Sequence, residues 1–165
     1  QNTAYIPAAF IASYYNGANV LLSSNTTVYT VPLGTPYDGY RNVSIVANNS
    51  YQINHTGKYI INYSIQYINT STTSEDIYVW IRKNNTDIPD TGSVFTINSK
   101  RSGTIPGKLI AVSPMHFSAN VGDTIQVMTT CYTANGVVSM ATIPAITTPP
   151  IPESPATIII INEIN

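Results

Sequence analysis

The alternation of side chains between Tyr59 and Tyr67 constrains the fold of this chain more than any other feature. The larger side chains fall on every second position of this segment, which is the pattern of a half-buried strand. After the polar run 69–76, residues 77–81 form a second segment of β-branched and aromatic residues, as is typical of strands. We expect these two segments to pair as antiparallel strands of a β-sandwich, with Trp80 and Tyr59 as anchors of its core.

The rest of the chain divides into short strand candidates separated by turn signals. No segment has the 3.6-residue period of a helix, and the dipeptides Asn16-Gly17 and Asn135-Gly136 predict hairpin turns. Residues 157–162 are so uniformly apolar that both faces of this last strand are expected to be covered. We expect an all-β, antiparallel β-sandwich of the jelly-roll type, in one domain that covers residues 1–165.

The low charge of the chain excludes two classes of partner. Charged residues make up 9% of the sequence and the formal net charge is −1, against about 25% charged residues in ordinary soluble domains. Nucleic acids and anionic lipids are bound through clusters of Lys and Arg, so we expect neither partner. The longest apolar run, 158–161, is far shorter than the roughly 20 residues of a membrane-spanning helix, so membrane insertion is not expected.

Side chains with catalytic or metal-binding chemistry are few and scattered. The single cysteine, Cys131, excludes an intrachain disulfide. His55 and His116 are not spaced as metal ligands, and no Ser stands in a nucleophile motif. The adjacent Glu75 and Asp76 fit a solvated turn, because a hydrolytic pair must also converge and have a raised pKa. We expect no enzymatic activity, no catalytic residue, no metal and no cofactor.

Three short motifs give the chain a resemblance to a known superfamily. Gly57-Lys58-Tyr59 opens the alternating strand, 82–84 (Arg-Lys-Asn) ends the strand after it, and Gly122-Asp123 forms a turn before 124–133. In this order they resemble the C1q/TNF-like jelly-roll superfamily, over residues 50–165, whereas the first 49 residues fit only loosely. Asn85 stands where that family usually has Gly, which puts the tightness of this turn in doubt.

The resemblance implies a homotrimer, because domains of this superfamily assemble as compact trimers. The run 80–84 and the ending 152–164 are more similar to head domains of viral and phage fibres, and to caps of collagen-like spore-surface proteins, than to animal C1q. The chain would then be the C-terminal head of a longer stalked protein. Asp123 most simply caps its turn, and a Ca²⁺ ligand near the threefold axis is the alternative, as in some C1q-like proteins. Apolar surface on a chain with 12 Tyr and few charges favours the trimer independently of the family.

A polar, weakly charged and Tyr-rich surface suits carbohydrate ligands. Sugars offer hydroxyls to Asn, Thr and Ser and apolar faces to Tyr rings, without requiring charge. The candidate contacts are Asp90, Lys100 and Arg101 in the loop region 87–107, together with 145–153. The resemblance would place both regions at the end opposite the termini.

We therefore hypothesise a non-enzymatic trimeric head of a virus or phage fibre, which attaches to a host or environmental surface through glycans or another receptor. Its location would be the virion surface or the extracellular space. The first alternative is a structural cap that trimerises a collagen-like stalk on a bacterial spore surface and binds no ligand. The second alternative is a glycan hydrolase. The Asn-x-Ser/Thr sequons are attributed to the abundance of Asn and Thr, although glycosylation of any of them would favour a secreted or eukaryotic-virus protein.

Overall fold

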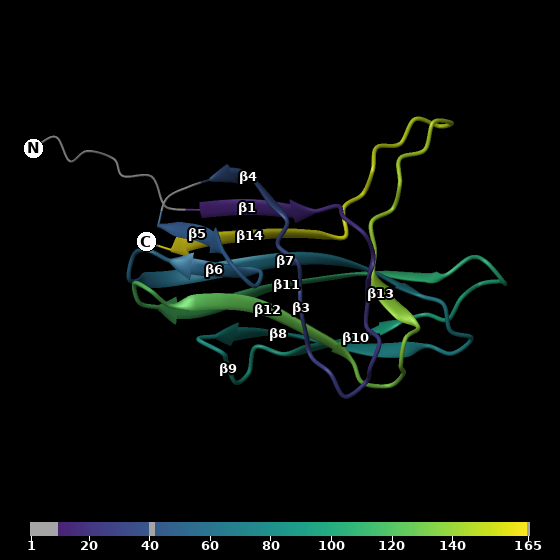
Figure 1. Cartoon of the computed structure of the whole chain (residues 1–165), viewed down its shortest axis with the longest axis horizontal. Coiled ribbons are helices and arrows are strands. Elements are labelled where there is room, and N and C mark those ends of the chain that lie inside the picture. Colours follow the sequence, from purple (N-terminus) through teal and green to yellow (C-terminus); the bar gives the residue numbers. More distant parts are fainter. Residues whose placement is uncertain (1–9, 40–41, 165) are drawn as a thin grey trace, which may run out of the picture.

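Residues 10–39 and 42–164 are described by the computed structural model, as fourteen strands and their connections. These residues contain no helix, and therefore none that is long and apolar enough to cross a membrane. The strands form two seven-stranded sheets in which every pairing is antiparallel (Figure 1). The expected all-β antiparallel sandwich is confirmed.

Two sheets, called sheet 1 and sheet 2 here, make the layers of the sandwich. Sheet 1 has the order β2-β13-β7-β14-β1-β4, with β11 paired along the other edge of β7. Its strands are β1 (Phe10–Tyr15), β2 (Val20–Leu21), β4 (Thr35–Gly39), β7 (Gly57–Asn69), β11 (Gly107–Ala119), β13 (Val138–Met140) and β14 (Thr157–Ile164). Sheet 2 has the order β10-β8-β12-β6-β5, with β3 beside β12 and β9 beside β8. Its strands are β3 (Tyr29–Thr30), β5 (Val43–Val46), β6 (Ser50–Ile53), β8 (Glu75–Lys83), β9 (Thr86–Asp87), β10 (Ser93–Ile97) and β12 (Thr124–Cys131).

The alternation in β7 builds the core, as the sequence predicts. Its odd-numbered residues from Tyr59 to Asn69 are buried and the even-numbered ones between them are partly exposed, because successive side chains of a strand point to opposite faces. The buried apolar residues of β7 belong to one core cluster with inward residues of sheet 2 such as Ile77 and Val127. Tyr59 is a member of this cluster and is 0% exposed. Each aliphatic side chain buried in this way contributes about 1.5–3 kcal/mol.

The predicted pairing of 59–68 with 77–81 is wrong, because the two strands lie in different sheets. β7 pairs with β11, β13 and β14, whereas β8 pairs with β9, β10 and β12. The polar connection between them folds on itself: Asn69 Nδ2 donates to the Thr73 carbonyl oxygen at 2.9 Å. Glu75 then accepts hydrogen bonds from the hydroxyls of Thr73 and Thr133, both at 2.7 Å. These bonds stabilise a link that carries the chain from one sheet to the other.

Trp80 does not anchor the core between the sheets. In β8 the side chains of Val79 and Ile81 belong to the core cluster, so Trp80 between them points to the outer face of sheet 2. It is only 8% exposed, and the connection between β9 and β10 lies beside it. The sequence-based expectation took the only tryptophan as an anchor of the core and did not use the alternation of its own strand.

The two predicted Asn-Gly hairpins are also wrong. After Asn16-Gly17, β2 pairs with β13 rather than with β1, and after Asn135-Gly136, β13 pairs with β2 and β7 rather than with β12. A tight hairpin does form at Asn84-Asn85, where β8 pairs with β9. Both residues adopt left-handed backbone angles, with φ of 49° and 63°, a region that Asn tolerates better than other non-glycine residues. Asn85 in place of Gly therefore keeps this turn tight.

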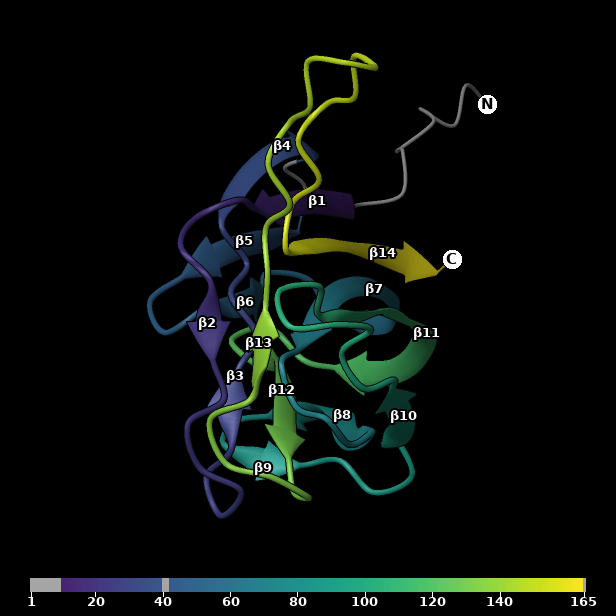
Figure 2. The same ribbon diagram turned by 90° about the vertical axis from the view of Figure 1, so that its right-hand side faces the viewer.

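The proline-rich segment after β13 forms an arm that extends from the sandwich and returns to β14 (Figure 2). Its two legs are joined by antiparallel bridges between Ile143 and Ser154 and between Ile146 and Ile151. The region 145–153, predicted to be a contact loop, is the outer part of this arm and is exposed.

Two buried tyrosines allow the contribution of a buried hydrogen bond to the free energy of unfolding to be measured. The hydroxyl of Tyr67 lies 2.7 Å from Thr129 Oγ1, whereas the buried hydroxyl of Tyr63 has no hydrogen-bond partner among the described residues. Tyr67→Phe should lower the free energy of unfolding by about 1–2 kcal/mol, because it leaves the Thr129 hydroxyl buried without its partner. Tyr63→Phe should change it by less than about 0.5 kcal/mol. Urea denaturation of both variants checks this, and equal losses would contradict the assignment.

Candidate functional site

The outward side chains of sheet 1 form an apolar surface, called the open face here. The even-numbered residues of β14 point away from the core, and Ile158 and Ile164 are 37% and 41% exposed. On β11, Ile110 and Val112 are 56% and 59% exposed. The expectation that both faces of the last strand are covered is therefore wrong for the isolated chain. One face of β14 is buried in the core, and the other is open.

Strand register makes the open face continuous. Val112 pairs with Ser64, which pairs on its other side with Ile158, and Ile158 pairs in turn with Tyr14. One row further on, Pro114, Asn62, Ile160 and Ala12 lie side by side in the same way. Cross-strand neighbours of this kind are in contact. The apolar side chains of β11 and those of β14 and β1 therefore lie on the same face, on either side of the small polar residues Ser64 and Asn62 of β7.

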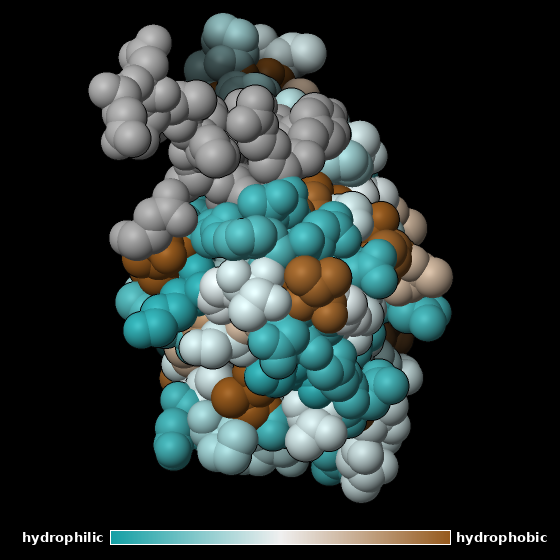
Figure 3. Space-filling view, turned by 90° about the vertical axis from the view of Figure 1, so that its left-hand side faces the viewer, coloured by the Kyte–Doolittle hydropathy of each residue, from teal (hydrophilic) through white to brown (hydrophobic). Residues whose placement is uncertain are grey.

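On β7, β11 and β14, the lysines of the open face stand only at its two ends. The outward lysines are Lys58 at the start of β7 and Lys108 at the start of β11, which runs the opposite way. The described outward residues between them are apolar or neutral, apart from His116. The end of the molecule where β14 finishes looks different: there apolar residues stand singly among polar ones (Figure 3). Soluble monomers rarely expose large contiguous apolar patches, which mark interaction surfaces.

The structure does not bring the three predicted binding residues together. Asp90 lines a pocket on the outer side of sheet 2. Arg101 lines a different pocket of about 230 Å³, which it shares with Lys108 and Pro106. Lys100 lines neither pocket, and its backbone N–H donates to the Ser71 carbonyl oxygen at 2.8 Å. Residues of the loop region 87–107 thus line two separate pockets.

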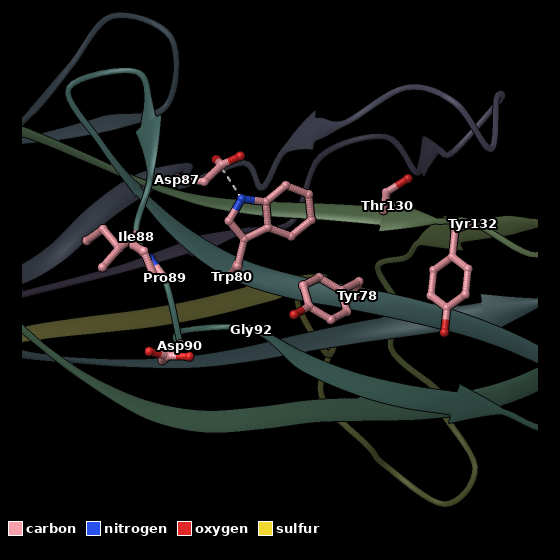
Figure 4. A pocket seen from close by; sticks show the side chains of 9 residues that line it. All are labelled: Tyr78, Trp80, Asp87, Ile88, Pro89, Asp90, Gly92, Thr130 and Tyr132. Carbon is pink, nitrogen blue, oxygen red and sulfur yellow. Dashed lines mark hydrogen bonds between the residues drawn. The ribbon is translucent and has the colours of Figure 1, made fainter.

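The pocket beside Asp90 contains the main cluster of accessible rings, and we call it the aromatic pocket. Its volume is about 360 Å³, and Figure 4 shows the side chains that line it. It is lined by Tyr78, Trp80, Asp87, Ile88, Pro89, Asp90, Gly92, Thr130 and Tyr132. The rings of Tyr78 and Trp80 are 5.6 Å apart at a tilt of 49°. Tyr78 and Tyr132 are 37% and 45% exposed, so their rings are accessible to a ligand.

Asp87 holds the Trp80 ring in place on one side of this pocket. The β8–β9 hairpin brings its carboxylate to Trp80, whose indole Nε1–H donates to Oδ1 at 2.7 Å. Arg82 Nε donates to the same oxygen, also at 2.7 Å. The hydrogen bond from Arg82 lowers the pKa of Asp87, with a further contribution from Trp80, while partial burial opposes the shift. The carboxylate is therefore ionised at neutral pH and is already compensated by Arg82.

Sequence reasoning missed most of the aromatic pocket. Tyr78, Asp87, Gly92 and Tyr132 come from different segments, and only their fold brings them together. One signal was present, because Tyr78 and Trp80 are two residues apart in a strand and must share a face. The Asn84-Asn85 turn was the second signal, since it folds Asp87 back onto that face.

The remaining candidate groups are engaged in local contacts. His55 Nδ1 lies 2.6 Å from Glu163 Oε1 at the edge of the sandwich, and His116 is exposed on the open face. Both carboxylate oxygens of Asp123 accept hydrogen bonds, from the Asn84 side chain at 2.7 Å and from the Asn120 backbone at 2.8 Å. The described part of the chain has no cluster of metal-ligating side chains.

Solved structures with a similar fold include a TNF protein and a complement C1q domain. Eiger TNF from S. frugiperda matches with a TM-score of 0.58 and 14% identity, over 97% of this chain and 94% of that chain. The globular domain of zebrafish complement 1qA protein matches with a TM-score of 0.54 and 6% identity, over 95% of this chain and 98% of that chain. No family model and no curated protein matches the sequence.

The likeness extends over almost the whole chain and not only over 50–165, where the sequence motifs lie. The reason is visible in sheet 1, where β1 pairs with β14 and β4 pairs with β1. These early strands complete the sheet that the final strand enters. The two antiparallel sheets and the matching solved structures together show that this chain has the C1q/TNF-like jelly-roll fold.

Proposed function

We propose that this chain is the non-enzymatic, homotrimeric head domain of a virus or phage fibre, which attaches its carrier to a host or environmental surface through glycans. The observation that carries the homotrimer is the open face of sheet 1, and the neutral, Tyr-rich composition of the chain favours glycans. Its location would be the virion surface or, more generally, the extracellular space.

Self-association follows from the physical chemistry of the open face. A patch that includes Ile110, Val112 and Ile158, each at least 37% exposed, is stabilised when another surface covers it. A second copy of the same face is suited to this, because the patch between Lys58 and Lys108 has no charges that would repel each other. A threefold arrangement agrees with the trimers of the family that the sequence resembles.

Attachment through glycans is supported by the composition of the remaining surface. The chain has 9% charged residues and 12 Tyr, so it offers aromatic rings and neutral hydrogen-bonding groups rather than a charged surface. Such groups suit neutral ligands such as sugars. The described residues contain no cluster of three or more His, Cys, Asp or Glu side chains, and the pair of His55 and Glu163 lies at the edge of the sandwich rather than in a pocket with the rings.

A glycan array tests the attachment. We expect the assembled protein to bind a restricted set of glycans and to release none of them as cleaved product. A clean array, together with strong stabilisation of a fused stalk, would instead identify a structural cap of the spore-surface type, which the open face supports equally well. Turnover of any glycan on the panel would identify a hydrolase and would contradict the proposal.

A further inference from the structure

We propose that the aromatic pocket on sheet 2 is a binding site for a pyranose ring, held against Tyr78, Trp80 and Tyr132. This inference rests on the proposed function, since it takes glycans as the ligand class, and it moves their site away from Lys100 and Arg101. The pocket volume of about 360 Å³ lies within the range of roughly 300–1,000 Å³ that is usual for small-molecule sites.

The rings provide the apolar part of the site. Tyr78 and Tyr132 are exposed by 37% and 45%, and Trp80 lies beside Tyr78 as the more buried floor. Figure 4 shows the Tyr78 and Trp80 rings next to each other and the Tyr132 ring further along the same lining. Aromatic side chains gain most from a partner with an apolar body and polar edges. The face of a pyranose ring, with C–H groups in the centre and hydroxyls around it, has this character.

The charges around the rings favour a neutral ligand over a cation. Asp87, the carboxylate that contacts the indole, already receives hydrogen bonds from Arg82 and Trp80 at 2.7 Å. A ligand cation at the rings would lie near the Arg82 guanidinium, and the carboxylate left to compensate it, that of Asp90, is exposed to water at the rim. Asp90 is exposed at the rim and makes no side-chain hydrogen bond or ion pair within the described residues. It therefore fits a hydroxyl of the ligand.

Further hydrogen-bonding groups stand around the rings. Thr130 donates its hydroxyl proton to the Thr27 carbonyl oxygen at 2.8 Å, so its oxygen remains able to accept. The hydroxyl of Tyr132 and the carboxylate of Asp90 stand on different sides of the rings in Figure 4. Together these groups offer several acceptors and a donor to sugar hydroxyls that point in different directions.

The loop over the site is held in place before any ligand binds. Ile88 N–H donates to the Ile81 carbonyl oxygen at 3.0 Å. The buried hydroxyl of Thr91 accepts from Ile81 N–H at 3.1 Å and donates to the Ile88 carbonyl oxygen at 2.9 Å. A pre-organised loop loses little conformational entropy on binding. The pocket also lies on the sheet opposite the open face, so an assembly through sheet 1 leaves it accessible.

Gly92 sets the position of the Tyr78 ring. A Cβ atom at Gly92 would overlap the Tyr78 hydroxyl, which points toward this residue in Figure 4. Gly92 has no left-handed backbone angle, so Ala fits the backbone and only the end of the tyrosine side chain must move. Gly92→Ala therefore disturbs the site without removing a ring. Gly103→Ala is the matched control, because a Cβ at Gly103 meets nothing within 4 Å.

The test uses the fluorescence of Trp80, which is the only tryptophan of the chain. The intact protein is titrated with methyl β-galactopyranoside, methyl α-mannopyranoside and methyl β-glucopyranoside at millimolar concentrations. We expect at least one of them to change Trp80 emission in a saturable way. Gly92→Ala and Tyr78→Ala should raise its dissociation constant by about 10-fold or more, whereas Gly103→Ala should leave it unchanged.

Three results would overturn this assignment. The first is that no pyranoside changes Trp80 emission in a saturable way, and the second is that Gly92→Ala and Tyr78→Ala bind the pyranoside as tightly as the intact protein does. The third is that the intact protein binds tetramethylammonium more tightly than any of the pyranosides. The glycan array distinguishes a failure of this site assignment from a failure of the proposed attachment function. If Tyr78→Ala keeps full array binding, attachment stands and the site is wrong. If free pyranosides bind at Trp80 but the array stays clean, the site stands and the attachment function fails.

Discussion

Val112→Asp should break the assembly into folded single chains. Val112 is 59% exposed on the open face, midway along the edge strand β11, so the substitution leaves the core intact. In an assembly it would bury a carboxylate without a partner, which costs about 3–5 kcal/mol. The dissociation constant should therefore rise by more than about 100-fold. Sedimentation velocity at micromolar concentration, with circular dichroism as a check of the fold, measures this.

Val94→Asp is the matched control for this experiment. Val94 is 52% exposed on β10, in sheet 2, so the same substitution is made on the opposite sheet at similar exposure. It should leave the assembly state unchanged. Equal dissociation by both variants, or an effect of neither, would show that the open face is not the surface through which copies meet.

Alkaline pH should unfold the protein steeply through its buried tyrosines. Burial raises the pKa of Tyr51 and of Tyr67, against the opposing hydrogen bonds from Ser13 and Thr129. Burial, together with the charge of Glu163, raises the pKa of Tyr59 to about 12. A raised folded-state pKa means that the unfolded chain loses these protons first, near pH 10. The stabilisation is then complete below pH 10 and is lost as the pH rises above it.

The expected loss is large because the effects of several tyrosines add. Each tyrosine that ionises only in the unfolded state lowers the free energy of unfolding by about 1.4 kcal/mol per pH unit. Tyr51 and Tyr67 together give about 3 kcal/mol per unit above pH 10, and Tyr59 adds to this up to pH 12. Urea denaturation at pH 8, 10 and 11 gives the slope, which Tyr67→Phe should reduce. A stability that stays flat to pH 11 would contradict the burial of these hydroxyls.

Local periodicity predicted individual strands well, because it depends on neighbouring residues alone. The alternation 59–67 lies within β7, 77–81 lies within β8 and 124–133 overlaps β12. The partners of these strands were predicted less well. β7 and β8 are adjacent in sequence, but the hydrogen bonds of Asn69 and Glu75 guide the connection across the sandwich. Pairing is decided by such contacts and by strands distant in sequence, which no local pattern contains.

The binding residues were harder to predict than the strands. Asp90, Lys100 and Arg101 were selected as polar residues in one long loop, yet that loop serves two separate pockets. Tyr132 comes from beyond the end of β12, and Gly92 matters only because it lies against the Tyr78 hydroxyl. Residues without charge or a motif carry no local signal. Only the three-dimensional arrangement shows that they share a pocket.

The mass of the unmodified chain in solution tests the central claim most directly. Sedimentation equilibrium at micromolar concentration should give three times the chain mass of 17.9 kDa, because the proposed trimer would bury the open faces of three copies. A single species of 17.9 kDa that remains stable and monodisperse at this concentration would contradict the account.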